Sequence, residues 1–208
     1  MLELIKAGGW LMAPILACSL AAATIIIERL LALRRARVLP AQLLATLDRW
    51  LEHGAMEARE VEALPLHSPL GRIVAAGLAS RGRSREILRE RVEDAGRHVA
   101  HELERFLNTL GTIAAISPLL GLLGTVAGMI KIFQIVSTQG NSNFSLLSVG
   151  IAEALVTTAA GLTVAIPSLL FYRYFNGRVD ALVVRMEQET LQLVDLLDAE
   201  TSEKEPSS

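Results

Sequence analysis

The sequence predicts an all-α fold: a helical integral membrane protein with three transmembrane helices, two of them extended into the cytoplasm, plus a helical cytoplasmic domain. Two observations support this prediction. Hydrophobic residues make up 51% of the 208 residues, although the chain also holds 20 basic and 22 acidic side chains, and a soluble domain of this size is rarely so apolar. The charges also leave three long apolar runs, at 11–27, 107–130 and 146–172, each long enough to cross a bilayer as a helix.

Each segment takes its bounds from the charges, glycines and prolines that interrupt the apolar pattern. In chain order we expect a short periplasmic N-terminus at 1–9, a transmembrane helix at 10–33, a cytoplasmic helical domain at 34–105, a transmembrane helix at 106–136, a periplasmic turn at 137–146, a transmembrane helix at 147–175, a cytoplasmic amphipathic helix at 176–200 and a disordered tail at 201–208. The tail is rich in Ser, Glu and Pro, a composition that cannot bury apolar surface.

The first apolar run has some features of a signal peptide. The segment before it balances one Lys with one Glu, and apolar residues continue through Leu33, so we expect an uncleaved anchor. The string at 15–18 is similar to a lipoprotein cleavage site, but Leu16 is poorly suited to the position two before the cysteine. Cys18 is the only cysteine, so an intrachain disulfide is excluded.

Basic residues flank the apolar runs on the sides that we expect to be cytoplasmic: Arg34, Arg35, Arg37, Arg105, Arg173 and Arg178. By the positive-inside rule, the N-terminus is periplasmic and the C-terminus cytoplasmic. The segment at 34–105 holds 13 Arg against 11 acidic residues, a near-neutral balance that argues against nucleic-acid binding.

The cytoplasmic segments carry helical signals. Pro40 and the pair Ser68-Pro69 are placed as at helix starts, and apolar residues from Ser84 onward recur at spacings of three and four, which predicts one helix over 85–136. An apolar stripe at 179–197 needs a packing partner, because a lone amphipathic helix is marginal in water. Three residues mark the expected turns between the cytoplasmic helices: Gly54, Pro65 and Gly82.

Glu153 is the only charged residue in the third apolar run. A charge in mid-membrane costs about 3 kcal/mol on insertion scales, so Glu153 is either paired structurally or functional. Each predicted span also contains one proline, Pro14, Pro118 or Pro167, and each proline is a candidate helix bend.

Small and hydroxyl residues line one face of each of the last two spans. The first face comprises Ser117, Gly121, Thr125 and Gly128, and the second Ala154, Thr158, Gly161, Ala165 and Ser168. Such faces permit close helix contact, in channels and in ordinary membrane proteins alike. Thr125 lies 11 residues before Val136 and Thr158 lies 11 after Leu147, which predicts similar depths in an antiparallel pair.

Lys131 lies at nearly the same predicted depth as Glu153. It is five residues before Val136, and Glu153 is six after Leu147. Two interpretations stay open: an intramembrane ion pair between Lys131 and Glu153, or a lysine that extends to the outer interface.

Two segments resemble a known family. Residues 121–129, Gly-Leu-Leu-Gly-Thr-Val-Ala-Gly-Met, and residues 150–155, Gly-Ile-Ala-Glu-Ala-Leu, are similar to motifs of the MotA/TolQ/ExbB proton-channel proteins, most closely the ExbB and TolQ branch. With the opening Lys6-Ala7-Gly8-Gly9-Trp10, the resemblance covers nearly the whole chain. Lys131 departs from the family pattern.

The resemblance implies a bacterial inner-membrane subunit of a motor that the proton-motive force drives. Five copies would surround two single-span subunits of the ExbD or TolR type, and a TonB-like or TolA-like protein would carry the motion across the periplasm. It implies that Thr125 and Thr158 line the pore, with Glu153 as a further pathway residue. The proton-carrying Asp would belong to the partner, and no cofactor is implied.

Three functions remain open from the sequence. The first is an ExbB–ExbD type motor subunit that energises outer-membrane transport through a TonB-like protein, or its TolQ-like counterpart in envelope integrity. The second is a self-sufficient ion channel that uses Glu153, and the third is a non-conducting scaffold. An enzyme is not expected, since phosphate-binding glycine loops and nucleophile motifs are absent from the sequence. His98 and His101 share a helical spacing, but we interpret them as surface residues and expect no metal site.

Overall fold

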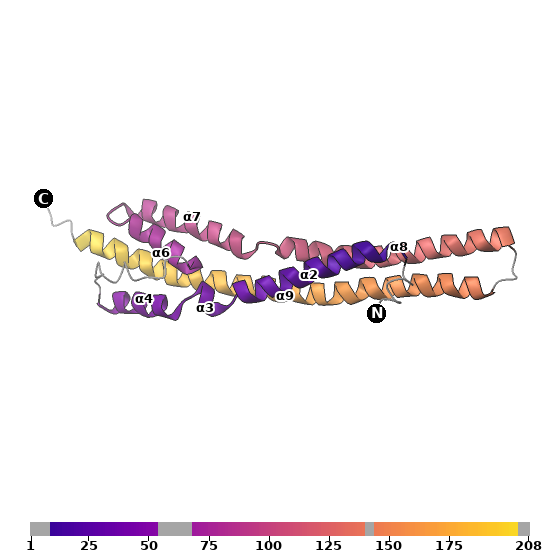
Figure 1. Cartoon of the computed structure of the whole chain (residues 1–208). Helices are drawn as coiled ribbons and strands as arrows, with labels where there is room; N and C mark the ends of the chain where they lie inside the picture. The colour runs from indigo at the N-terminus through magenta and orange to yellow at the C-terminus, as the bar shows by residue number, and fades with distance from the viewer. Residues whose placement is uncertain (1–8, 54–67, 140–143, 204–208) are drawn as a thin grey trace. The chain divides into compact units, whose positions relative to one another are not determined.

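The computed structural model describes residues 9–53, 68–139 and 144–203, and every regular element in these ranges is a helix (Figure 1). In chain order the helices are α2 (Met12–Ala32), α3 (Arg35–Val38), α4 (Ala41–His53), α6 (Pro69–Ala79), α7 (Arg85–Leu103), α8 (Leu107–Gln139) and α9 (Phe144–Glu203). Within the described ranges, α2, α8 and α9 supply three helices long and apolar enough to cross a membrane. The predicted all-α membrane fold is therefore confirmed.

The chain divides into two compact units. The first consists of Met1–Glu28 and Phe106–Tyr174, and the second of Arg29–Arg105 and Phe175–Ser208. The first unit contains most of α2, all of α8 and the first half of α9. The predicted N-terminal segment up to residue 8, and residues 140–143 of the predicted turn, lie outside the described residues.

In the second unit, α4 and α6 begin where the sequence signals predict. The carbonyl of Pro40 accepts the first hydrogen bond of α4, from the amide of Leu44 at 3.2 Å. The Ser68 hydroxyl accepts a hydrogen bond from the Gly71 amide at 3.0 Å, with Pro69 at the first helical position. The Ser68 hydroxyl satisfies a backbone N–H that would otherwise be unpaired at the helix start, and Pro69 has no N–H to satisfy. Gly54 and Pro65 lie outside the described residues.

The apolar stripe of α9 forms the core of the second unit. Its buried members are Phe175, Val179, Leu182, Met186, Leu193, Val194 and Leu197. Leu193 and Leu197 lie within ordinary contact of the backbone of α6 at Gly77, where an added Cβ would lie 3.4 Å and 3.6 Å from their methyl groups. The partner that this stripe requires is thus supplied within the chain. Helix α9 continues to Glu203, and residues 204–208 of the predicted tail lie outside the described residues.

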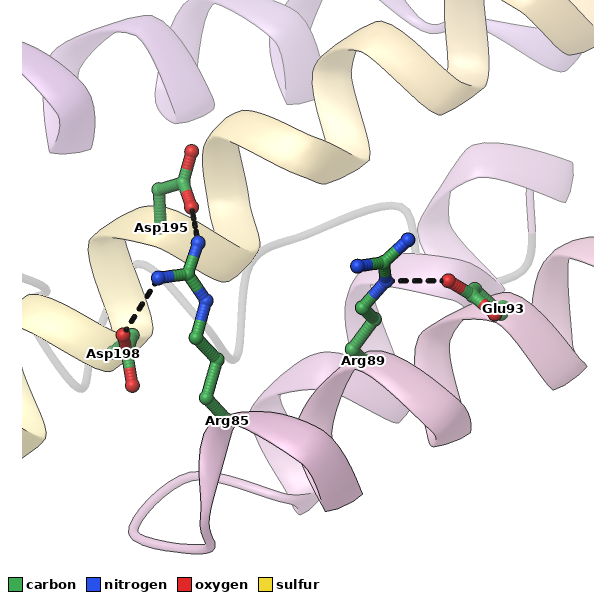
Figure 2. A network of polar contacts seen from close by, with 5 residues as sticks. All are labelled: Arg85, Arg89, Glu93, Asp195 and Asp198. Atoms are coloured by element: carbon green, nitrogen blue, oxygen red, sulfur yellow. Dashed lines mark hydrogen bonds and ion pairs between the residues drawn. The ribbon is translucent and has the colours of Figure 1, made fainter.

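Charged side chains link α7 to the end of α9 (Figure 2). The guanidinium of Arg85 lies 2.8 Å from Asp195 and 3.5 Å from Asp198, and Arg89 pairs with Glu93 on its own helix at 2.7 Å. These side chains are mostly exposed, so each pair stabilises the fold by less than about 1 kcal/mol. These ion pairs therefore orient α7 along α9 more than they stabilise the contact between the two helices.

The structure differs from the single helix predicted over 85–136. Helix α7 ends at Leu103 and α8 begins at Leu107. Phe106 has a φ of +63°, a left-handed conformation that interrupts the ladder of helical hydrogen bonds and is costly for a bulky residue. Glycine and proline are absent from 104–106, so the sequence gives no sign of this break.

The three prolines occupy different places in their helices. Pro118 and Pro167 lie inside α8 and α9, whereas Pro14 lies in the first turn of α2. A proline in the first turn removes no interior hydrogen bond, so Pro14 has less reason to bend its helix. The predicted bends at Pro118 and Pro167 remain predictions.

Candidate functional site

Helices α8 and α9 run antiparallel with their backbones in close contact. A Cβ atom added at Gly121 would lie 3.0 Å from the Cα of Thr158, and one added at Gly161 would lie 2.5 Å from the carbonyl oxygen of Ser117. A side chain does not fit at Gly161, and one at Gly121 would require the facing backbone to shift by a few tenths of an ångström. Further pairs continue the contact: Gly124 with Thr157, Gly128 with Ala154, and Gly150 with Ile132.

This contact is rotated slightly from the small-residue faces that the sequence predicts. Gly124 and Thr157 are buried in it, whereas Thr125 and Thr158 lie beside it and are partly exposed. Thr157 is the polar residue that sequence reasoning missed, and its hydroxyl donates to the Glu153 carbonyl at 2.8 Å. The signal was present, since Thr157 lies four residues before Gly161 and so falls on the same helix face.

The two predicted pathway hydroxyls bond to backbone carbonyls. Thr158 donates across the helix contact to the Gly121 carbonyl at 3.0 Å, and Thr125 donates to the Leu122 carbonyl of its own helix at 2.7 Å. Because each hydroxyl proton is engaged, each oxygen presents its lone pairs as acceptors. Both groups can therefore receive a hydrogen bond from a protonated carboxyl or a water molecule.

Thr125 and Thr158 do not lie at the same depth, contrary to the prediction. Thr158 is level with Gly121, which precedes Thr125 by one helical turn, or roughly 6 Å along the axis. The prediction counted residues from the turn between the helices. The glycine contacts set the register instead, because they decide which turns approach each other.

Lys131 and Glu153 are brought together. The Lys131 ammonium lies 2.8 Å from the Glu153 carboxylate, and the side chains are 52% and 21% exposed respectively. A Cβ added at Gly9, which precedes α2, would collide with the same carboxylate. The structure thus joins Glu153 to Lys131 rather than to the hydroxyl of Thr158, from which it is separated by about 140° around α9.

Arg29 is a buried charge that sequence reasoning missed. It is 5% exposed and donates to the carbonyls of Leu103 at 3.1 Å and Glu102 at 3.4 Å, at the end of α7. A cation favours the negative end of a helix dipole. The signal was a charge inside an apolar stretch that continues to Leu33.

The described histidines form no metal site. His98 is 83% exposed and lies 3.9 Å from Asp94. Among the residues that the structure describes, no group of three or more His, Cys, Asp or Glu side chains is placed to hold a metal ion.

Comparison with protein-family models matches residues 66–188 to the MotA/TolQ/ExbB proton channel family. The matched region contains α6, α7, α8 and most of α9. It therefore includes the close α8–α9 contact, both pathway threonines and the Lys131–Glu153 pair.

Similar proteins agree with this match. A Synechocystis protein named biopolymer transport protein ExbB-like 3 is 34% identical over 194 residues, covering 90% of each chain. An ExbB homolog of Methanothermobacter thermautotrophicus is 31% identical over 189 residues, covering 89% of this chain but 66% of its own length. The Pseudomonas aeruginosa Tol-Pal system protein TolQ is 39% identical over 84 residues, which are 40% of this chain and 36% of its own length. The chain belongs to the MotA/TolQ/ExbB proton channel family.

Proposed function

We propose that this chain is the inner-membrane subunit of an ExbB–ExbD type motor, which uses the proton-motive force to energise outer-membrane active transport through a TonB-like protein. One observation supports the proposal most directly. Thr125 and Thr158 lie beside the close α8–α9 contact, partly exposed, with their oxygens available as acceptors. Family membership and the ExbB names of several relatives point the same way.

In this proposal the proton-carrying carboxyl belongs to a single-span partner. A protonated partner carboxyl would donate to a threonine oxygen, which would hold the carboxyl in place until it exchanges its proton with water. The glycine contacts hold α8 against α9, so the two hydroxyls keep fixed positions while the partner moves past them. Glu153 is the third predicted pathway residue, but its contact with Lys131 favours the structural role argued below.

The proposed assembly is a pentamer around two partner helices of the ExbD or TolR type. The chain would lie in the bacterial inner membrane with its N-terminus periplasmic and its C-terminus cytoplasmic. Large apolar side chains remain exposed along α8 and α9, among them Val126, Phe133, Leu155 and Leu170. Lipid and neighbouring copies would cover these faces.

A TolQ-like role in envelope integrity is the second candidate. The similarity to the Pseudomonas aeruginosa TolQ favours it as well, at an identity comparable to that of the ExbB relatives. A non-conducting scaffold of the same fold is the third, and it predicts that the threonine hydroxyls are dispensable.

One experiment separates these candidates. Cells that carry this chain with a single-span subunit of the ExbD or TolR type are assayed for outer-membrane uptake and for envelope integrity. Wild type is compared with Thr158→Val at equal membrane abundance, and Thr163→Val is the matched control, because the exposed Thr163 hydroxyl bonds only within α9, to the Ala159 carbonyl.

The transport motor predicts that Thr158→Val reduces uptake. A hydrogen bond from a neutral, protonated carboxyl is worth about 0.5–1.5 kcal/mol, which corresponds to roughly a twofold to tenfold fall in rate. Thr163→Val should keep wild-type uptake. Loss confined to envelope integrity would support the TolQ-like role, and normal activity of Thr158→Val in both assays would support the scaffold.

A further inference from the structure

We infer that Glu153, Lys131 and Gly9 form a clasp that fastens the three apolar helices of the first unit to one another, and that Glu153 is a positioning residue in this chain rather than an ion carrier. The clasp brings together the N-terminal end of α2, the last third of α8 and the third turn of α9. It does not depend on the proposed motor function, because its first readout is the assembly of this chain alone.

The ion pair is the first part of the clasp. Lys131 and Glu153 come from different helices, and their charged atoms lie 2.8 Å apart, the length of a strong charge-assisted hydrogen bond. The flanking contacts of Gly128 with Ala154 and Gly150 with Ile132 hold the two helices together on both sides of it. The pair therefore lies where the helix register is already fixed. Forming it costs little additional conformational entropy.

Gly9 is the second part of the clasp. Its φ is +69°, and its missing side chain leaves room for the Glu153 carboxylate, which any Cβ at this position would meet. The Gly9 carbonyl also accepts the Met12 amide at 3.2 Å and so starts the first turn of α2. The entry of α2 is thereby placed directly against the paired carboxylate.

The chemistry of the pair explains why Glu153 is not free to carry an ion. Lys131 already supplies the positive charge that a transported cation would bring to the carboxylate. Removing either partner strands the other charge, which is strongly unfavourable in an apolar environment. An ion carrier must release its partner in every cycle, whereas a clasp must keep it.

A double-mutant cycle tests the clasp on the full chain expressed without its partner subunit. The variants are Lys131→Met, Glu153→Gln, the two combined, and the charge exchange Lys131→Glu with Glu153→Lys. Membrane abundance and the thermal midpoint in detergent are measured. Glu90→Gln, an exposed glutamate on α7, is the matched control.

The clasp predicts that each single variant loses several-fold in abundance and that the combined variant recovers most of this loss. The charge exchange should also exceed both single variants. If the single variants fail to accumulate while the combined variant does, the pairing is supported equally. Damage in the combined variant equal to the sum of the single losses, or no loss in either single variant, would overturn the inference.

A substitution at Gly9 tests the clasp independently of the ion pair, and proton flux provides a second readout. Gly9→Ala should lower the thermal midpoint in wild type but much less in a Glu153→Ala background, where only the strain of the positive φ remains. Equal effects in both backgrounds would contradict contact with the carboxylate.

With the partner subunit present, the combined variant of Lys131→Met and Glu153→Gln should keep most of the proton flux. Its complete loss in an assembled complex would make Glu153 a carrier instead.

Discussion

At the scale of single residues, most buried polar groups in the described part of the chain find their partners on the backbone, although Glu189 pairs with the Arg185 side chain at 3.0 Å. Ser117, Ser168 and Thr190 are buried and donate to carbonyls four residues earlier in their own helices. Arg29 donates to the end of a different helix, α7. Each bond removes the cost of an unsatisfied polar group in an apolar environment.

Arg29→Met is expected to destabilise the second unit. The change leaves the Leu103 and Glu102 carbonyls without their cation, at a cost of about 1–3 kcal/mol. Thermal unfolding of the purified chain measures this effect, with the exposed Arg35→Met as the control. Equal midpoints for the two variants would show that Arg29 does not secure the end of α7.

At the scale of helices, the α8–α9 contact depends on glycine where backbones meet. Gly161→Ala would drive a methyl group into the Ser117 carbonyl region and separate the helices. Gly177 lies on the same helix, α9, with nothing within 4 Å of an added Cβ. The two positions therefore test close contact against helix propensity alone.

Gly161→Ala should reduce assembled protein, whereas Gly177→Ala should leave it unchanged or stabilise it by up to about 1 kcal/mol, since alanine favours a helix. Membrane abundance and thermal midpoint of both variants decide the matter. A loss of similar size at Gly177 would mean that neither position reports on helix contact.

The sequence predicts these helices well but not their register. Apolar runs locate α2, α8 and α9, and Ser68-Pro69 locates the start of α6, because these signals are local. The left-handed Phe106 and the one-turn offset between Thr125 and Thr158 are not local. The offset accompanies the glycine contacts between α8 and α9, and Phe106 directly follows the end of α7, where Arg29 bonds to the Leu103 carbonyl.

At the scale of the whole molecule, the chain is a membrane protein of a channel family, and that family is not a class of enzymes. Its two units differ in composition. The first unit consists of apolar helices that carry Thr125 and Thr158, and the second buries the α9 stripe in a helical core.

Leu193→Ala is expected to destabilise the second unit. Leu193 is 1% exposed, and truncating a buried leucine costs about 2–5 kcal/mol. Arg85→Ala, which removes only exposed ion pairs to α9, should cost less than about 1 kcal/mol. Thermal unfolding of both variants compares them, and a larger effect of Arg85→Ala would contradict an apolar origin of the stability of the second unit.

The most direct test of the proposed pathway is proton flux into vesicles that contain this chain and its single-span partner. Wild type, Thr158→Val and Thr158→Ser are compared at equal complex content, under a proton gradient and under a sodium gradient. The account predicts proton flux that Thr158→Val lowers several-fold and that Thr158→Ser, which keeps the hydroxyl, retains. Undiminished flux in Thr158→Val would contradict it and leave Thr158 as a packing residue.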